Sequence, residues 1–255
     1  IKQKTNSIGV TWRKRFKDGT GYMETTLSNN RLENIFTNYL DPENETGIIF
    51  RNDAVESETK LRYQLTKFIN EWKITSGFNI QNSFYSNNTI NNADAIFYIT
   101  EIDFMKYGVF ANATRSFFDD KLDISVGFRM DDDSFTIASD LSSNFSPRLS
   151  LSYEFKENWR VSATAGRYFK ITPYTILGFR DANDNLTNQD SDYTQSDHYV
   201  IGIQHYLNPA ASISLEGFYK QYSDYPVSVL DQVSLANKGA DFEVLGNEDI
   251  ETIGK

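Results

Sequence analysis

Apolar and polar residues alternate strictly through the stretch SPRLSLSYEFKENWRVSATAGRYF, residues 146–169. From Pro147 to Phe155 every odd position is apolar or aromatic, whereas the even positions between them carry Arg, Ser or Glu. The alternation stops at 156–158 and then resumes. A period of two places successive side chains on opposite faces of a β-strand. The stretch therefore predicts two strands that meet at a tight turn, with one apolar face and one polar face.

The same period recurs along the rest of the chain and predicts about ten antiparallel strands. We expect these strands at 6–16, 21–38, 59–69, 72–85, 101–117, 121–130, 146–156, 159–169, 196–207 and 211–222. Short turns are expected at 17–20, 69–71, 119–120, 156–158 and 208–210, and long loops at 40–58, 86–100, 131–145, 171–195 and from 223 onward. Tight turns that alternate with long loops are rare in soluble all-β domains. They are typical of a transmembrane antiparallel up-and-down β-barrel, with short periplasmic turns and long extracellular loops.

Turn lengths test whether neighbouring strands present the same face, because directly opposed residues of an antiparallel pair share a face. Three hairpins predict one continuous apolar face. The expected pairs are Phe155 with Trp159, Tyr153 with Val161, Leu151 with Ala163, Phe117 with Leu122, Ala113 with Val126, Ala111 with Phe128, Ile203 with Leu215, and Tyr199 with Tyr219. On the polar face Glu154 falls opposite Arg160. We expect Arg129, Arg148, Glu154 and Arg160 to point into a barrel lumen.

Aromatic residues gather at two heights along the expected strands. The group beside the short turns contains Phe16, Tyr22, Phe68, Trp72, Phe117, Phe155, Trp159 and Tyr206. The group at the far ends contains Tyr39, Phe84, Tyr85, Tyr98, Phe169, Tyr222 and Tyr225. Amphipathic aromatic rings prefer a membrane–water interface, so the two groups predict two girdles. The alternative is the ordinary enrichment of aromatic residues in β-sheets.

Composition agrees with alternating strands rather than with long apolar segments. The 255 residues include 19 Phe and 15 Tyr, yet the mean hydropathy is −0.51. No apolar run approaches the roughly 18 residues that a transmembrane helix needs, so none is expected. The chain contains no cysteine, which excludes disulfides and thiolate metal ligands.

The net charge of −10 is distributed unevenly. The five expected loops hold 22 of the 35 acidic residues, but only Arg51, Arg180, Lys238 and Lys255 among the basic ones. The loops are therefore strongly acidic, whereas the expected strands and short turns carry an excess of positive charge. Acidic loops remain solvated and repel phosphate, so no nucleic-acid partner is expected.

The segment FSPRLSLSYEFKENWRVSATAGRYFKITPYTILGF, residues 145–179, resembles a hairpin and the following extracellular loop in TonB-dependent outer-membrane transporters. SPRL opens the pattern, AGRYF continues it, and TPY leads into the loop. The first hairpin, SIGVTWRKRFKDGTGYMETTLSNN, is similar to an early strand pair of such a barrel.

The resemblance implies a barrel of about 22 strands that an N-terminal plug domain closes. It implies import of a scarce nutrient, such as a siderophore, vitamin or glycan, with energy from the TonB complex. The expected partners are outer-membrane lipid, a small nutrient ligand, and the TonB complex through the plug. Residues 1–255 are expected to be an internal fragment of the barrel domain, without the plug and the C-terminal strands, in the outer membrane of a Gram-negative bacterium.

No group of residues points to catalysis, a cofactor or a metal. The only histidines, His198 and His205, face opposite sides of one expected strand and therefore cannot share a metal ion. The stretch DANDNLTNQDSD, residues 181–192, begins like an EF-hand loop, but Leu186 occupies the position that requires Gly. We expect a protein that is not an enzyme, and a weaker calcium site in the acidic loops remains open.

Members of this family commonly capture ligands with loop aromatics and lumen-facing polar groups. The resemblance therefore makes Tyr174, Phe179, Arg180 and Tyr193, in the loop 171–195, the candidate ligand contacts. The alternative is that these residues anchor the loop at the headgroup interface. Two other classes remain open from the sequence: a different outer-membrane barrel, such as a porin or adhesin, and a soluble β-sandwich or lectin-like binding module.

Overall fold

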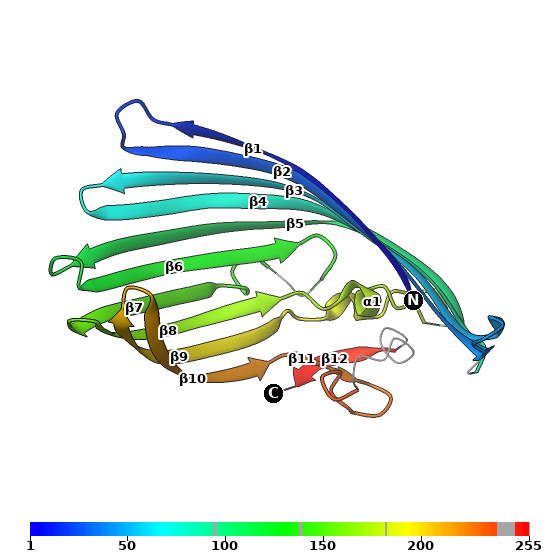
Figure 1. Cartoon of the computed structure of the whole chain (residues 1–255). Coiled ribbons are helices and arrows are strands. Elements are labelled where there is room, and N and C mark those ends of the chain that lie inside the picture. The colour runs from blue at the N-terminus through cyan, green and yellow to red at the C-terminus, as the bar shows by residue number, and fades with distance from the viewer. Residues whose placement is uncertain (94–95, 138–139, 182, 239–247, 255) are drawn as a thin grey trace.

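The computed structural model describes residues 1–93, 96–137, 140–181, 183–238 and 248–254. Ten strands form one antiparallel sheet in which each strand pairs with its neighbours along the chain (Figure 1). These strands are β1 (Lys2–Arg15), β2 (Gly21–Asp41), β3 (Thr46–Ile69), β4 (Trp72–Asn91), β5 (Ile96–Phe117), β6 (Leu122–Asp133), β7 (Ser146–Lys156), β8 (Trp159–Lys170), β9 (Thr194–Asn208) and β10 (Ala211–Ser223). The smaller elements are α1 (Tyr174–Leu177), the 3-10 turn η1 (Asn188–Asp190), β11 (Tyr225–Ser228) and β12 (Ile250–Gly254).

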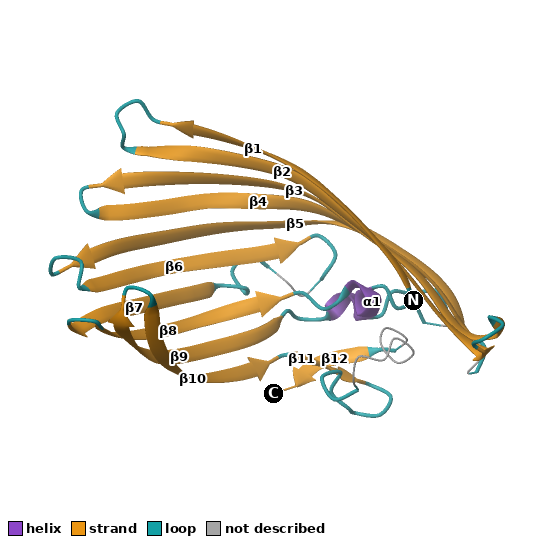
Figure 2. Ribbon diagram, viewed as in Figure 1, coloured by secondary structure: helices purple, strands orange, loops and turns teal. Residues whose placement is uncertain are grey.

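The ten-stranded sheet is curved and open. In the described residues β1 and β10 are its two edges and do not pair with each other. Figure 2 shows that α1 lies beside the concave side of the curved sheet. One curved sheet of consecutive hairpins is the architecture of an incomplete up-and-down barrel, as the sequence predicted, and not of a two-sheet sandwich.

The strand register confirms the predicted common faces with one exception. Tyr153 pairs with Val161 and Leu151 with Ala163, and the pairs expected in the other two hairpins form as well. The prediction that Phe155 opposes Trp159 is wrong, because Lys156 is the partner of Trp159. Asn158 adopts a left-handed φ of 65° in a tighter turn than expected, and the register shifts between Glu154 and Lys156. Phe155 is the extra residue of the resulting bulge.

The prediction of loops at 40–58 and 86–100 is wrong for the most part, because β2 to β5 extend through these residues. These four strands contain 21, 24, 20 and 22 residues. At about 3.3 Å per residue β3 is about 80 Å long, whereas a tilted strand crosses a bilayer with about 9–11 residues. Thr, Asn, Ser and charged residues interrupt both faces of the outer halves, so the strict apolar alternation ends there while the hydrogen-bonded ladder continues.

The two faces of β4 and β5 exchange polarity part-way along the strands. Nearer the short turns, the convex face carries exposed Phe78, Ile80, Met105, Tyr107 and Val109, while Asn79 and Gln81 face the concave side. Farther from these turns, Asn82 and Asp103 lie on the convex face and share a 2.6 Å hydrogen bond. The concave face there is apolar and buried, with Tyr85, Ile102 and Phe104.

The concave apolar patch is the main core of the described structure. Tyr85, Ile102 and Phe104 pack against residues that the loops contribute, namely Phe135, Tyr174 and Leu177. The prediction that Tyr85 belongs to the outer aromatic girdle is therefore wrong, because its side chain is 2% exposed and lies in this core. The loop after β8 needs an apolar surface to pack on, and this need explains why the inner face becomes apolar where the loop covers it.

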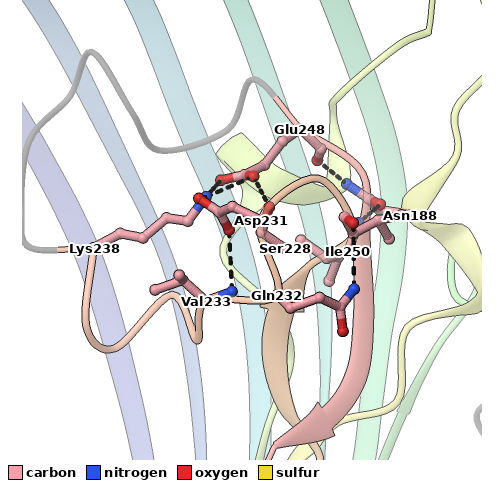
Figure 3. A network of polar contacts seen from close by, with 9 residues as sticks. Asn188, Ser228, Asp231, Gln232, Val233, Lys238, Glu248 and Ile250 are labelled. Carbon is pink, nitrogen blue, oxygen red and sulfur yellow. Dashed lines mark hydrogen bonds and ion pairs between the residues drawn. The ribbon is translucent and has the colours of Figure 1, made fainter.

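The expected loop from 223 onward contains the small β11–β12 sheet, while 239–247 lies outside the described residues. Figure 3 shows the polar contacts that hold this unit together. The Lys238 ammonium lies 2.9 Å from Asp231 and 2.8 Å from Glu248, and the Lys238 side chain is 8% exposed. Although burial alone lowers the pKa of Lys238, its hydrogen bonds to Glu248 and Asp231 raise that pKa overall.

Asn188 joins this unit to the loop that follows β8 (Figure 3). Its fully buried side-chain amide donates to the Ile176 carbonyl at 2.8 Å and the Glu248 carbonyl at 3.1 Å, and it accepts from the Ile250 N–H at 3.0 Å. One amide thus satisfies three backbone groups, one from α1 and two from the segment that leads into β12. None of the helices in the described part of the chain has the length and apolar character required to cross a membrane.

Candidate functional site

The loop after β8 crosses the concave face of the sheet and is fixed there by Tyr174. Pro173 precedes α1, which places Tyr174 in the first helical turn. The Tyr174 hydroxyl lies 2.8 Å from Glu58 Oε1 on β3 and 3.2 Å from Ser83 Oγ on β4. Burial is the main reason that the pKa of Tyr174 is raised. The phenol therefore stays neutral and donates to the glutamate.

Lys106 on β5 completes this contact. Its ammonium is hydrogen-bonded to the Tyr174 hydroxyl, lies 3.1 Å from Glu58 Oε1, and sits 4.8 Å from the centre of the Tyr174 ring. An acid, a base and a phenol from three distant segments thus satisfy one another in a half-buried position.

Tyr193 closes the other end of the same loop. It is 6% exposed, and its hydroxyl donates to Asp133 Oδ2 at 2.7 Å. Asp133 also accepts from the backbone N–H groups of Phe135 and Thr136, both at 2.7 Å. Burial and then the nearby Asp133 charge raise the pKa of Tyr193. The loop is thus fastened at both ends by a buried phenol and a carboxylate.

Phe179 and Arg180 lie between these two contacts. The Phe179 ring meets Tyr98 of β5 edge to face, with ring centres 6.4 Å apart. The Arg180 guanidinium donates to the Asp184 carbonyl at 2.8 Å, and Arg180 also forms a β-bridge with Leu186. The structure therefore places all four candidate loop residues on one loop, but each has protein partners and they do not converge on one point.

The four residues expected to face a lumen share the concave side of the sheet. Arg129 donates to Asn79 on β4 at 2.9 Å and pairs with Asp131. Arg148 stacks over Tyr168 at 4.5 Å from its ring centre. Glu154 Oε2 and Arg160 Nη2 are 3.6 Å apart across the β7–β8 hairpin.

Three cavities border the concave face beside this loop. A cavity of about 310 Å³ is lined by basic residues of β3, β5 and β6, together with Tyr193. One of about 820 Å³ lies between the ends of β8, β9 and β10 and the loops, and aromatic and aliphatic side chains line most of it. The third, of about 370 Å³, contains Glu56, Glu58 and Tyr174. Lys170 and Ile171 line all three cavities.

Sequence reasoning missed several of the residues that line these cavities. Lys60 and Arg62 lie on the polar face of an expected strand, as Arg129 and Arg148 do on theirs. The criterion that selected Arg129 and Arg148, a basic residue on a polar strand face, could therefore have found them as well. The sequence places Glu58 in an expected loop and Lys106 in an expected strand, and only the fold brings the two side chains together. Across the described ranges, no group of three or more His, Asp or Glu residues is arranged to hold a metal ion.

Comparisons with known proteins agree with this architecture. The family model described as "TonB dependent receptor-like, beta-barrel" matches residues 2–249. The solved "Copper transporter OprC" superposes with a TM-score of 0.67 at 14% identity, covering 88% of this chain and 40% of that one. No curated protein sequence matches the chain.

Two further solved structures share the fold. The pyoverdine outer membrane receptor FpvA from Pseudomonas aeruginosa PAO1 gives a TM-score of 0.66 at 16% identity, covering 98% of this chain and 40% of that one. The alcaligin outer membrane receptor FauA from Bordetella pertussis gives 0.64 at 11% identity, covering 98% and 41%. The chain thus spans about two fifths of the length of these structures. Because the family model covers almost the whole sequence, the chain belongs to the TonB-dependent receptor β-barrel family.

Proposed function

We propose that residues 1–255 form part of the barrel wall of an outer-membrane receptor that imports a scarce nutrient with energy from the TonB complex. The observation that carries the proposal is the family match over residues 2–249, on a sheet whose convex face is apolar nearer the short turns. Receptors of this family bind small ligands and interact with TonB. The proposal assigns TonB coupling to a plug domain outside residues 1–255.

The exchange of polarity along β4 and β5 supports a membrane position. Lipid favours the exposed convex band of Phe78, Ile80 and Val109, because a β-barrel presents apolar side chains outward over about 25 Å. Where Asn82 and Asp103 replace that band, the convex side meets water instead. The proposal therefore puts the halves of β2 to β5 that are farther from the short turns outside the cell, and the short turns in the periplasm.

The loop after β8 lies where an external ligand would arrive. We infer that Tyr174, Phe179, Arg180 and Tyr193 shape the entrance, with Arg129, Arg148, Glu154 and Arg160 along the lumen wall. The similar structures include the siderophore receptor PirA, the pyoverdine receptor FpvA and the copper transporter OprC, which supports a metal-chelate nutrient as the ligand class.

Nutrient-limited growth tests this function. Deletion of the full-length gene should abolish uptake of one scarce nutrient, and deletion of tonB should abolish the same uptake, while the protein fractionates with outer membranes. Uptake that persists unchanged without tonB would contradict TonB-driven import, and recovery of the protein in the soluble fraction would contradict the membrane position.

A further inference from the structure

Two cavities of different chemistry share one wall at the end of β8. Phe169, Lys170 and Ile171 line both the basic cavity of about 310 Å³ and the aromatic cavity of about 820 Å³. This short segment separates them where β8 gives way to the loop that crosses the concave face. A single bound molecule that contacts this segment can therefore reach both.

The basic cavity carries positive charge that the described protein does not neutralise. Its lining includes Lys106 and Arg129, which are paired with Glu58 and Asp131, and also Asp132, so the three remaining cations outnumber one remaining carboxylate. The other three cations that line it, Lys60, Arg62 and Lys170, form no ion pair within the described residues. Three unpaired cations around one cavity favour an anionic group, which gains charge-assisted hydrogen bonds there.

Several aromatic rings line the larger cavity, together with aliphatic residues such as Ile176 and Leu235. Tyr168 and Phe169 come from β8, Tyr222 from β10 and Tyr225 from β11. The His198 ring stands 4.7 Å from the Tyr168 ring. The volume of about 820 Å³ falls within the range of roughly 300–1,000 Å³ that is usual for small-molecule sites. Such a lining suits a flat aromatic group, because offset stacking adds to the gain from burial.

Resting on the proposed import function, we propose that the two cavities form one binding site for a ligand with a planar aromatic part and an attached anionic group. The aromatic part lies in the chamber that Tyr168 and Tyr222 line. The anionic group, a carboxylate, sulfonate or phosphate, reaches Lys170 and the cations beyond it. Lys170 determines specificity, because it is the unpaired cation that borders both chambers.

The third cavity sharpens this assignment. It is lined by Glu56 and Glu58 together with Lys106 and Lys170, so its two carboxylates are balanced by two ammonium groups and only the basic chamber offers an excess of positive charge. The site should therefore separate ligands by the sign of their charge while the aromatic part is kept constant.

Three matched probes test the proposal on the purified full-length protein in lipid nanodiscs: 1-naphthoate, 1-naphthalenemethanol and 1-naphthylmethylammonium. Calorimetric titration should show that the anion binds about tenfold tighter than the other two. Lys170→Gln should remove that advantage and leave the alcohol unchanged. Tyr222→Ala should weaken the anion and the alcohol together. Lys73→Gln, which changes a lysine on the same face next to a short turn, is the matched control and should have no effect.

Equal affinity for the three probes would overturn the proposal, and so would equal results for the Lys170 and Lys73 variants. These outcomes are separate from a failure of the import function. If uptake depends on TonB but the three probes bind equally, only the proposed ligand class is rejected. A preference for the anion without TonB-dependent uptake supports the site and removes the import function.

Discussion

The Tyr174 hydroxyl and Glu58 Oε1 are 2.8 Å apart although 116 positions separate the two residues in the sequence. This contact fastens the loop after β8 to the concave wall, and Lys106 neutralises the glutamate beside it. Because Tyr174 is also one of the aromatic residues of the core, the hydrogen bond and the packing act together.

Removing the Tyr174 hydroxyl should loosen this loop without unfolding the sheet. Tyr174→Phe keeps the ring and leaves the Lys106–Glu58 ion pair, so the local cost should be about 1–2 kcal/mol. Amide hydrogen exchange should become faster at 174–177 and remain unchanged in β7. Tyr199→Phe is the control, because its ring is 52% exposed on the convex face. Equal exchange at 174–177 in wild type and Tyr174→Phe would show that the contact does not hold the loop.

Alkaline pH should release the same loop. The pKa values of Tyr174 and Tyr193 are both raised, chiefly by burial. Their neutral forms therefore add stability that is fully present below the ordinary tyrosine pKa of about 10 and is lost as the pH rises above it. Protease cleavage within 171–193 should increase only above pH of about 10, where tyrosine absorbance near 295 nm also rises. In the double variant Tyr174→Phe and Tyr193→Phe, cleavage should no longer depend on alkaline pH.

The ion pairs of Lys238 should hold the unit that contains β11 and β12. Lys238→Met leaves Glu248 half-paired in a position where its side chain is 11% exposed, so the unit should lose about 3 kcal/mol. Hydrogen exchange should rise at 225–235 and at Ile250. Lys220→Met is the matched control on exposed β10. If both variants exchange alike, the network in Figure 3 contributes nothing to local stability.

The two faces of the β7–β8 hairpin should respond oppositely to a charge. Leu151 pairs with Ala163 on the convex face, whereas Ser152 pairs with Ser162 on the concave face. In a bilayer, Leu151→Arg should cost about 2–4 kcal/mol and Ser152→Arg much less, because only the first puts a charge in lipid. Denaturant unfolding of the full-length protein from vesicles measures both. Equal costs would place neither side chain in lipid.

Alternation in the sequence was enough to predict ten strands, their common faces and the Glu154–Arg160 pair. This works for Leu151, Tyr153 and Val161 because a face that meets one medium along its length keeps a strict period of two. The bulge at Phe155 escaped prediction, because one residue more or less in a turn leaves almost no trace in the pattern.

Alternation could not predict the outer halves of β2 to β5. Residues such as Thr89 and Asn87 lie on a concave face where buried polar groups bond to one another, and on the convex face Asn88 and Glu101 interrupt the apolar residues. Polar residues thus interrupt both faces over these stretches, and neither face keeps a continuous apolar period, so the pattern resembles a loop. The candidate site also depends on contacts such as Tyr174 with Glu58, and no local signal connects residues so far apart in sequence.

The most direct test of the membrane assignment uses the absence of native cysteine in this chain. In the full-length protein, freed of any cysteine outside this chain, single cysteines at Ile80, Leu151, Ser152 and Asp103 would carry nitroxide labels in vesicles. Collisions with oxygen and with a water-soluble nickel chelate would then be measured by electron paramagnetic resonance. The account predicts high oxygen and low nickel accessibility at Ile80 and Leu151, and high nickel accessibility at Ser152 and Asp103. Labels at Ile80 and Leu151 that neither reagent reaches would place this face in a protein core and contradict the account.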